Sequence, residues 1–116
     1  MSGIDLKVIS SERITENLPN YIKDDEIYVK VYLKITNNSN KPFEFSWQRC
    51  YAIDEDGQEI RSNALANLNG LQEITIAPGE SIDGFVPFLI NKDSNIKKFK
   101  YYKRIMSKVP AFEFDL

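Results

Sequence analysis

The stretch that decides the fold is EIYVKVYLKIT, residues 26–36. Every second position in it is apolar, and the apolar residues are Ile27, Val29, Val31, Leu33 and Ile35. Successive side chains of an extended strand point to opposite faces of a sheet, so this period of two predicts a strand with one buried face. The residues that follow, 37–42, read NNSNKP and are typical of a turn. We therefore expect a central strand that ends in a tight turn.

The rest of the chain repeats this pattern of short strands between turns. Further strands are predicted at residues 4–10, 43–53, 59–61, 71–76, 82–90, 96–105 and 109–115. Residues 11–25 show no period and predict a loop or a frayed edge, whereas residues 62–70 predict a helical turn or an irregular crossover. Pro87 cannot donate a ladder hydrogen bond, which favours an edge strand or a bulge. Roughly seven to nine short strands with such turns are typical of an immunoglobulin-like antiparallel β-sandwich.

The aromatic run at residues 43–53 is predicted to form one long, bent strand. The alternation that begins at Phe43 resumes in the same parity at Tyr51, and Arg49 interrupts it. We expect a β-bulge or a crossing between two sheets at that interruption. This parity places Tyr51 on the same side as Phe43, with Cys50 on the other side.

The composition indicates a single folded domain, residues 1–116. Hydrophobic residues make up 42% of the chain and charged residues 28%, which is ordinary for a globular protein. The seven Phe and six Tyr residues favour strands over helices. Cys50 is the only cysteine, so the sandwich is expected to have no intrachain disulfide.

Several classes of function are excluded or disfavoured by the residue inventory. The chain has no histidine, which excludes Ser-His-Asp and Cys-His catalysis and zinc sites that require imidazole. The formal net charge is −2, so no overall field attracts nucleic acid, and nucleic-acid binding is not expected. We therefore expect a protein that is not an enzyme and that uses no cofactor and no metal.

The location of the protein in the cell depends on its N-terminus. No stretch approaches the roughly 18 apolar residues that span a bilayer, so no membrane span is expected. Residues 1–5, MSGID, show no basic region followed by an apolar one, as a secretory leader would. As written, the chain is expected in the cytoplasm, and it is expected outside the cell or at the cell surface if a leader was removed.

The order of the motifs resembles a large bacterial family of domains of unknown function, named after an immunoprotective extracellular protein. Gram-positive lipoproteins and secreted proteins carry most of its members. The resemblance runs from about Ile27 to Tyr101, and the positions that carry it are Asn38, Pro42, Asp56, Gly57, Pro78, Gly79, Gly84 and Phe88. It implies an immunoglobulin-like sandwich that works as an extracellular binding or adhesion module without established catalytic residues. The chain departs from the family in showing no leader or lipobox cysteine.

Positive charge is concentrated near the C-terminus. Seven of the fifteen basic residues lie there: Lys92, Lys97, Lys98, Lys100, Lys103, Arg104 and Lys108. Strand alternation predicts one outward face that carries Lys98, Lys100, Tyr102 and Arg104. Cations interleaved with an aromatic side chain could bind an anionic cell-wall polymer or an acidic protein. The alternative is an edge strand whose lysines discourage pairing with other chains.

A second candidate surface lies on the central strand. Tyr28, Lys30 and Tyr32 share the face opposite the apolar one, and exposed aromatic side chains supply contact area at low entropic cost. The alternative is that they only pair with neighbouring strands of the same sheet.

The acidic turn and the cysteine are weaker candidates. Residues 54–59, DEDGQE, place four carboxylates close together, as a calcium site would need, but an Asp-Gly hairpin turn explains the same sequence. Whether this turn binds a cation is left open. Cys50 has no histidine to activate it, so we expect an inert, partly buried thiol.

Two functions fit these observations. The first is a non-enzymatic module of a bacterial surface or secreted protein that binds a protein or a cell-wall ligand. The second is an intracellular inhibitor or immunity-type protein, encoded by a phage or mobile element, that blocks a larger protein partner. The candidate binding surface for either consists of Lys98, Lys100, Tyr102, Arg104, Tyr28, Lys30 and Tyr32. The identity of the partner, the strand pairing order and the oligomeric state do not follow from the sequence.

Overall fold

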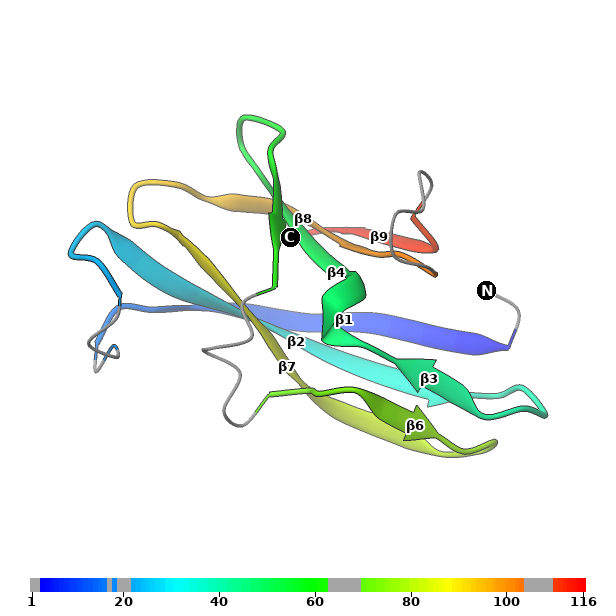
Figure 1. The fold of residues 1–116 in the computed structure, drawn as a ribbon. Helices are drawn as coiled ribbons and strands as arrows, with labels where there is room; N and C mark the ends of the chain where they lie inside the picture. The colour runs from blue at the N-terminus through cyan, green and yellow to red at the C-terminus, as the bar shows by residue number, and fades with distance from the viewer. Residues whose placement is uncertain (1–2, 17, 19–21, 63–69, 104–109) are drawn as a thin grey trace.

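The fold was analysed on a computed structural model, which describes residues 3–16, 18, 22–62, 70–103 and 110–116 (Figure 1). Its elements are β1 (Ile4–Ile14), β2 (Glu26–Asn37), β3 (Phe43–Phe45), the 3-10 turn η1 (Trp47–Arg49), β4 (Cys50–Asp54), β5 (Glu59–Arg61), β6 (Ile74–Ile76), β7 (Ser81–Asn91), β8 (Ile96–Tyr101) and β9 (Phe112–Asp115). These nine strands confirm the expected all-β chain. Within these ranges, no helix is long and apolar enough to cross a membrane.

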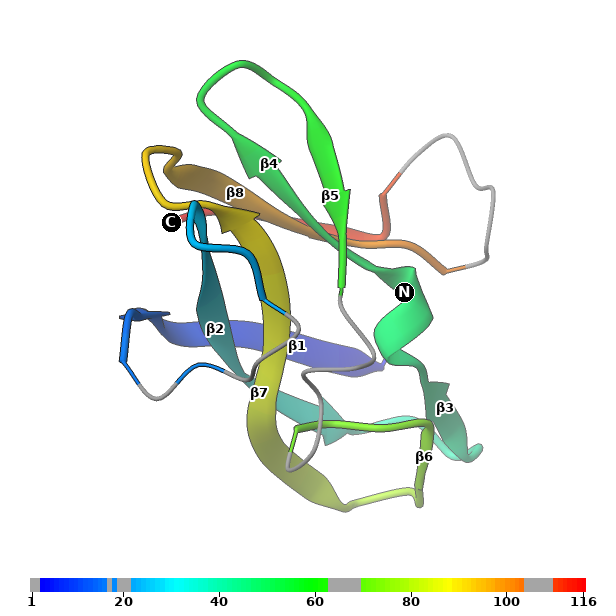
Figure 2. The ribbon, with the colours of Figure 1, turned by 60° about the vertical axis from the view of Figure 1, so that its left-hand side comes forward.

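The strands form three antiparallel sheets, with the orders β1-β2-β7, β3-β6 and β5-β4-β8-β9. Figure 2 shows the four-stranded sheet facing the β1-β2-β7 sheet, with β3 and β6 to one side. Both layers contribute fully buried side chains to one core, as in the edge-on contact between Phe88 of β7 and Phe99 of β8, whose ring centroids are 6.3 Å apart. β2 is a central strand, as its alternation predicted: it pairs with β1 from Tyr28 to Asn37 and with β7 from Glu26 to Thr36. The architecture is an immunoglobulin-like sandwich.

The turn η1 interrupts the predicted strand at residues 43–53 and carries the chain from the β3-β6 sheet to the four-stranded sheet. The expected interruption near Arg49 is therefore confirmed as a crossing between sheets. The expected parity beyond it is wrong, because the turn shifts the alternation by one residue. Cys50 faces the core with no exposed surface, whereas Tyr51 pairs with Lys100 on the outer face.

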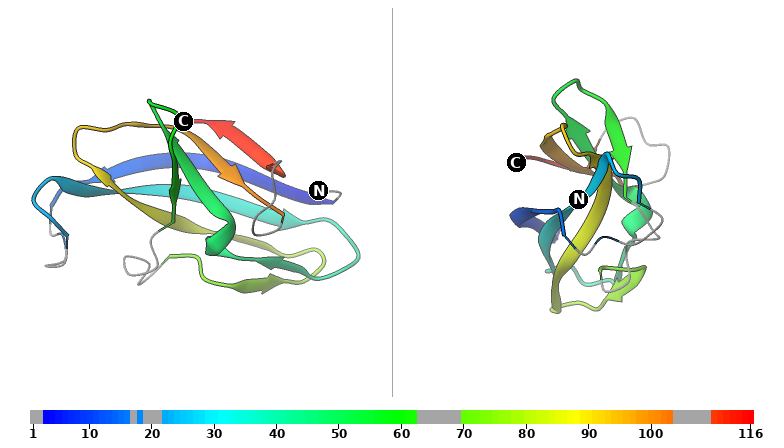
Figure 3. Two further views of the ribbon diagram at one scale, coloured as in Figure 1. Left: turned by 45° about the horizontal axis from the view of Figure 1, so that its top comes forward. Right: turned by 90° about the vertical axis from the view of Figure 1, so that its left-hand side faces the viewer.

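Strand β1 extends further than expected. It continues to Ile14 because β2 is long enough to pair with it as far as Tyr28. Of the two alternatives predicted for residues 11–25, a loop is therefore wrong for residues 11–14, which belong to an edge strand. The register shifts between Val8 and Ser10, which identifies a β-bulge at Ile9. Figure 3 shows β1 and β9, the edge strands of the two layers, on the same side of the molecule.

Pro87 lies on β7, an edge strand of the three-stranded sheet, as the sequence predicted. At an edge, a residue without an N–H group can be accommodated. Beyond this edge the backbone N–H of Leu71 donates to the carbonyl of Phe85 at 2.8 Å. The predicted strand at residues 71–76 is reduced to Ile74–Ile76. Most of the predicted crossover at residues 62–70 lies outside the described residues.

Asn37, the last residue of β2, is a fully buried polar side chain whose amide is fully hydrogen-bonded. Its Nδ2 donates to the carbonyls of Lys41 and Ile76, each at 2.8 Å. Its Oδ1 accepts from the backbone N–H and the hydroxyl of Ser39, at 2.9 and 2.6 Å. This side chain therefore joins the end of β2 to the following turn and to β6, which explains the tight turn that the sequence predicts here.

We expect Asn37→Asp to destabilise the fold by about 3–5 kcal/mol, because it removes both donors and places a buried carboxylate against two carbonyl oxygens. The matched control is Asn38→Asp, which makes the same change at an exposed neighbour. Chemical denaturation at neutral pH measures the free energy of unfolding of both variants. Equal stabilities would contradict the role assigned to Asn37.

Candidate functional site

The predicted basic surface lies on the outer face of the four-stranded sheet. Strand β8 pairs with both β4 and β9, so the alternative interpretation of its lysines as edge protection is wrong. The ammonium group of Lys100 lies 3.8 Å from Glu59 on β5 and 3.4 Å from Glu113 on β9. Lys98 is partly buried and pairs in register with Asp115. Carboxylates on strands at both sides of β8 therefore offset the positive charge of this lysine-rich strand.

Tyr102, predicted to be an outward aromatic on this surface, is 8% exposed. Its hydroxyl donates to Glu59 at 2.6 Å, and its ring meets that of Tyr51 edge-on, with centroids 5.2 Å apart. The expectation that it interleaves with the lysines as an exposed ring is therefore wrong, because the neighbouring strands cover it. Burial, and then the hydrogen bond to Glu59, raise the pKa of Tyr102 to about 12. Arg104, the fourth residue of this predicted surface, lies outside the described residues.

The raised tyrosine pKa values predict a loss of stability at alkaline pH. Burial also raises the pKa of Tyr101 to about 12. A raised folded-state pKa gives stability that is complete below the unfolded value, near 10, and that is lost as the pH rises toward 12. We expect each of these two tyrosines to contribute about 2–3 kcal/mol to that loss. Tyrosinate absorbance and urea unfolding at stepped pH measure it.

Tyr102→Phe removes one titrating group and serves as the comparison for this measurement. Its stability should fall less steeply with pH than that of the wild type. A wild-type free energy of unfolding that stays constant across this alkaline range would contradict the prediction.

Only part of the surface predicted on β2 is accessible. Tyr28 is 5% exposed, because β1 and β7 flank it on both sides, so its expected exposure is wrong. Lys30 and Tyr32 are partly exposed and both contact Phe85 on β7. The ammonium group of Lys30 lies 4.4 Å from the centroid of the Phe85 ring, and the Tyr32 ring meets it edge-on at 5.8 Å. The structure brings these two predicted residues together around an aromatic side chain that the sequence analysis did not single out.

Ile9 was also missed by the sequence analysis. It is 59% exposed, the larger exposure of the two large hydrophobic side chains found exposed among the described residues. The bulge in β1 places it beside a shallow hollow of about 390 Å³ that Tyr32 and Gly84 also line. The available signal was the pair Val8-Ile9, which breaks the alternation of β1. We call the surface formed by Ile9, Lys30, Tyr32 and Phe85 the aromatic face.

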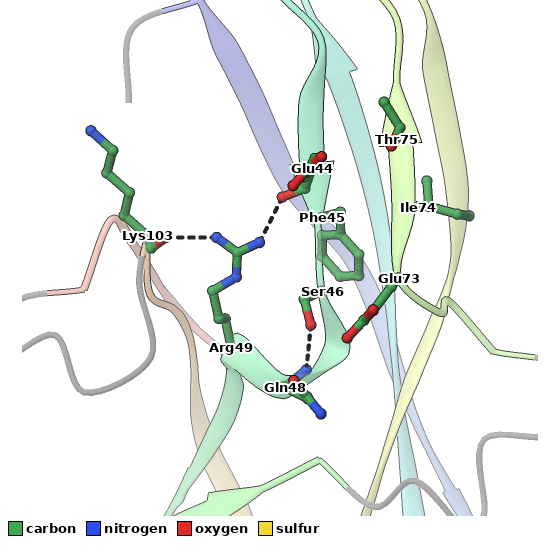
Figure 4. Close-up of a pocket in the computed structure, with 9 residues that line it drawn as sticks. All are labelled: Glu44, Phe45, Ser46, Gln48, Arg49, Glu73, Ile74, Thr75 and Lys103. Atoms are coloured by element: carbon green, nitrogen blue, oxygen red, sulfur yellow. Dashed lines mark hydrogen bonds between the residues drawn. The ribbon is translucent and has the colours of Figure 1, made fainter.

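A third site, a polar hollow of about 630 Å³, lies where η1 separates β3 from β4. We call it the turn pocket. Figure 4 shows its lining residues, which are Glu44, Phe45, Ser46, Gln48, Arg49, Glu73, Ile74, Thr75 and Lys103. They come from β3, η1, β6 and the segments next to β6 and β8, so no local sequence motif could have identified the set.

Arg49 is a charged side chain of the turn pocket that two hydrogen bonds hold in place. Its guanidinium donates to the backbone carbonyl of Lys103 at 2.6 Å and to that of Glu44 at 2.8 Å (Figure 4). Its central carbon lies 5.6 Å from the centroid of the Tyr101 ring. The residue that the sequence analysis treated only as an interruption therefore ties β3 to the end of β8.

Cys50 follows η1 and is fully buried. Burial raises the pKa of its thiol well above the ordinary value, and the nearby Arg49 lowers that pKa by a smaller amount. Because the thiolate is the reactive form, this raised pKa disfavours reaction of Cys50 in the folded protein. The thiol is more deeply buried than the sequence predicted, since it has no exposed surface.

We expect native protein to react with a chromogenic disulfide reagent at a rate limited by unfolding, because Cys50 has no exposed surface. In denaturant the single thiol should react at the rate of a free cysteine. The kinetics of thiol release under both conditions measure the difference. A fast native reaction would contradict the burial of Cys50.

The acidic turn is a hairpin. The carboxylate of Asp54 accepts from the backbone N–H groups of Asp56 and Gln58, each at 2.9 Å, and Gly57 has a φ of 81°. Asp54 therefore acts as a turn-forming side chain, and β4 and β5 pair across the turn. In the described part of the chain, no three His, Cys, Asp or Glu side chains are grouped so that they could hold a metal ion.

This geometry defines the class of protein: an immunoglobulin-like β-sandwich whose notable surface features are an aromatic sheet face and a polar pocket. A family model matches residues 3–111, and the chain belongs to that family, which is described as a domain of unknown function (DUF4352). The resemblance seen in the motifs is thereby confirmed. No curated protein sequence matches the chain.

Solved structures share the fold at low sequence identity. MPT63, a secreted protein from Mycobacterium tuberculosis, has a TM-score of 0.75 at 16% identity, covering 97% of this chain and 82% of that one. The ycdA protein of Bacillus subtilis, described as a putative lipoprotein, has a TM-score of 0.74 at 17% identity, covering 97% of this chain. This chain spans 36% of the length of that protein. The yjhA protein of Bacillus subtilis has a TM-score of 0.63 at 16% identity, covering 85% of this chain and 72% of that one.

Proposed function

We propose that this protein is a non-enzymatic binding module of a bacterial surface or secreted protein, and that it binds a protein partner through the aromatic face. The observation that carries the proposal is the exposure of Ile9, at 59%, beside a shallow hollow on the same sheet face. The similarity in fold to a secreted protein and to a putative lipoprotein supports the surface or secreted location.

The chemistry of the aromatic face suits a protein partner. Tyr32 and Phe85 lie on the rigid strands β2 and β7, so they offer contact area with little loss of side-chain entropy on binding. The ammonium group of Lys30 lies over the Phe85 ring and adds a positive charge to this apolar surface. The hollow beside Ile9 can accept an apolar side chain of the partner, which is how a small number of residues supplies most of the affinity of an interface.

The bulge in β1 favours docking on the face over pairing along the edge. A bulge re-aims a side chain and disrupts the regular row of backbone groups that an added strand would need. Here it turns Ile9 outward in the middle of an edge strand of eleven residues. The partner is therefore expected to contact side chains of the sheet face.

The test compares partner recovery by surface variants of the domain. Ile9→Asp should lower the affinity at least tenfold, about 1.4 kcal/mol, because it places a charge in the apolar contact. Lys98→Glu, on the outer face of the other sheet, is the control and should bind like the wild type. Each immobilised domain is incubated with bacterial surface extract at low and high salt, and quantitative mass spectrometry identifies the proteins retained.

The same experiment distinguishes binding at the aromatic face from binding at the lysine-bearing outer face of the four-stranded sheet. A partner that is lost with Lys98→Glu and at high salt, but kept with Ile9→Asp, would assign binding to the lysine-bearing face and to an anionic ligand. That outcome, or the retention of no protein by the wild type, would overturn binding through the aromatic face.

A further inference from the structure

The turn pocket places charges of both signs around one hollow. Glu44 and Glu73 provide carboxylates and Arg49 provides a cation, whereas Lys103 contributes its backbone carbonyl, and its ammonium group points away from the hollow (Figure 4). The ion pairs found among the described residues lie elsewhere, at Lys7 and Lys100, so none of these three charges has an oppositely charged partner there within 4.0 Å. Positive and negative groups therefore line the same hollow without forming ion pairs with each other, so one ligand could contact both.

Arg49 is held in place without being neutralised. Its two hydrogen bonds go to backbone carbonyl oxygens, which carry no net charge, and they occupy two of the five N–H donors of a guanidinium. The side chain is partly buried and rests near the ring of Tyr101. A fixed guanidinium loses little entropy when it binds, and its planar fork matches a carboxylate.

The opposite wall supplies acceptors. Figure 4 shows Arg49 and Lys103 on one side of the pocket and Glu73 and Thr75 on the other, with the Phe45 ring between them. Glu73 is exposed, and no hydrogen bond or ion pair to another described residue engages its carboxylate. The volume of about 630 Å³ falls within the range of small-molecule sites.

We propose that the turn pocket binds a small zwitterion, with its carboxylate on Arg49 and its ammonium group on Glu73. A simple anion would meet the repulsion of Glu44 and Glu73, and a simple cation would meet that of Arg49. A ligand with both charges, such as a free amino acid or a short peptide with free ends, matches both walls. This proposal is independent of binding at the aromatic face.

The test titrates isotope-labelled domain with glycine and with Gly-Gly, followed by NMR. Both ligands should shift the backbone amide signals of Gln48, Arg49 and Thr75 in a saturable way. Gly-Gly blocked by N-acetylation or by C-terminal amidation should bind at least tenfold more weakly than free Gly-Gly, because each modification removes one charge. Tighter binding of glycine identifies a free amino acid as the ligand, and tighter binding of Gly-Gly identifies a peptide; both support the proposal.

Two substitutions test separately whether Arg49 binds the ligand carboxylate and whether Glu73 binds the ligand ammonium group. Glu73→Gln should lower the affinity for Gly-Gly at least tenfold and leave the affinity for the N-acetylated form unchanged. Arg49→Lys keeps the charge but loses the planar fork, and it should weaken both forms. Because Arg49 also ties two backbone segments, Glu73→Gln is the decisive variant. Glu80→Gln, at the exposed turn before β7, is the matched control and should bind like the wild type.

Two outcomes would overturn the proposal: no saturable shift with either zwitterion at millimolar concentration, or blocked Gly-Gly binding as tightly as the free form. Acetate binding as tightly as glycine would overturn it as well, because it would identify a simple anion site. Ile9→Asp should leave binding of Gly-Gly unchanged, so failure at this pocket and failure at the aromatic face are distinguishable.

Discussion

The constraint on which the rest of the structure depends is the crossing of the chain from one sheet to another within the three residues of η1. A strand has only two faces, and a turn that inserts an odd shift exchanges them. This exchange buries Cys50 and Ala52 in the core of the four-stranded sheet. It also brings Arg49 to the end of β8 and places Gln48 and Arg49 in the lining of the turn pocket, beside β3 and β6. One local departure from strand geometry thus sets part of the core and one of the candidate sites.

Charge in this protein is organised across strands. Lys100 lies in a basic segment of the sequence, yet in the sheet it has Glu59 on one side and Glu113 on the other. Such partly exposed ion pairs contribute little stability, but they reduce the net charge that an anionic ligand would meet. In the turn pocket, by contrast, the guanidinium of Arg49 donates to uncharged backbone carbonyl oxygens, so these bonds do not offset its positive charge. A sequence that is strongly polarised therefore folds into one face with balanced charge and one pocket with separated charges.

The two candidate sites use different physical principles. The aromatic face is a sheet surface where Tyr32 and Phe85 present apolar area on rigid strands, which suits a protein. The turn pocket is a concave site with a fixed cation, which suits a small charged ligand. The two sites lie on different sheets of the sandwich. The fold itself, shared at 16–17% identity, does not specify either ligand.

The sequence by itself determined the strands and most turns, because alternation and turn chemistry act between residues close in the chain. The faultless alternation of β2, the turn after Asn37 and the edge position of Pro87 all follow from such local rules. Only the tertiary structure decided which faces are exposed. Tyr28 and Tyr102 are buried because strands distant in sequence flank them, and Ile9 is exposed because pairing with β2 forces a bulge. The turn pocket could not be predicted, since its charges come from separate segments that only the packing of the sheets brings together.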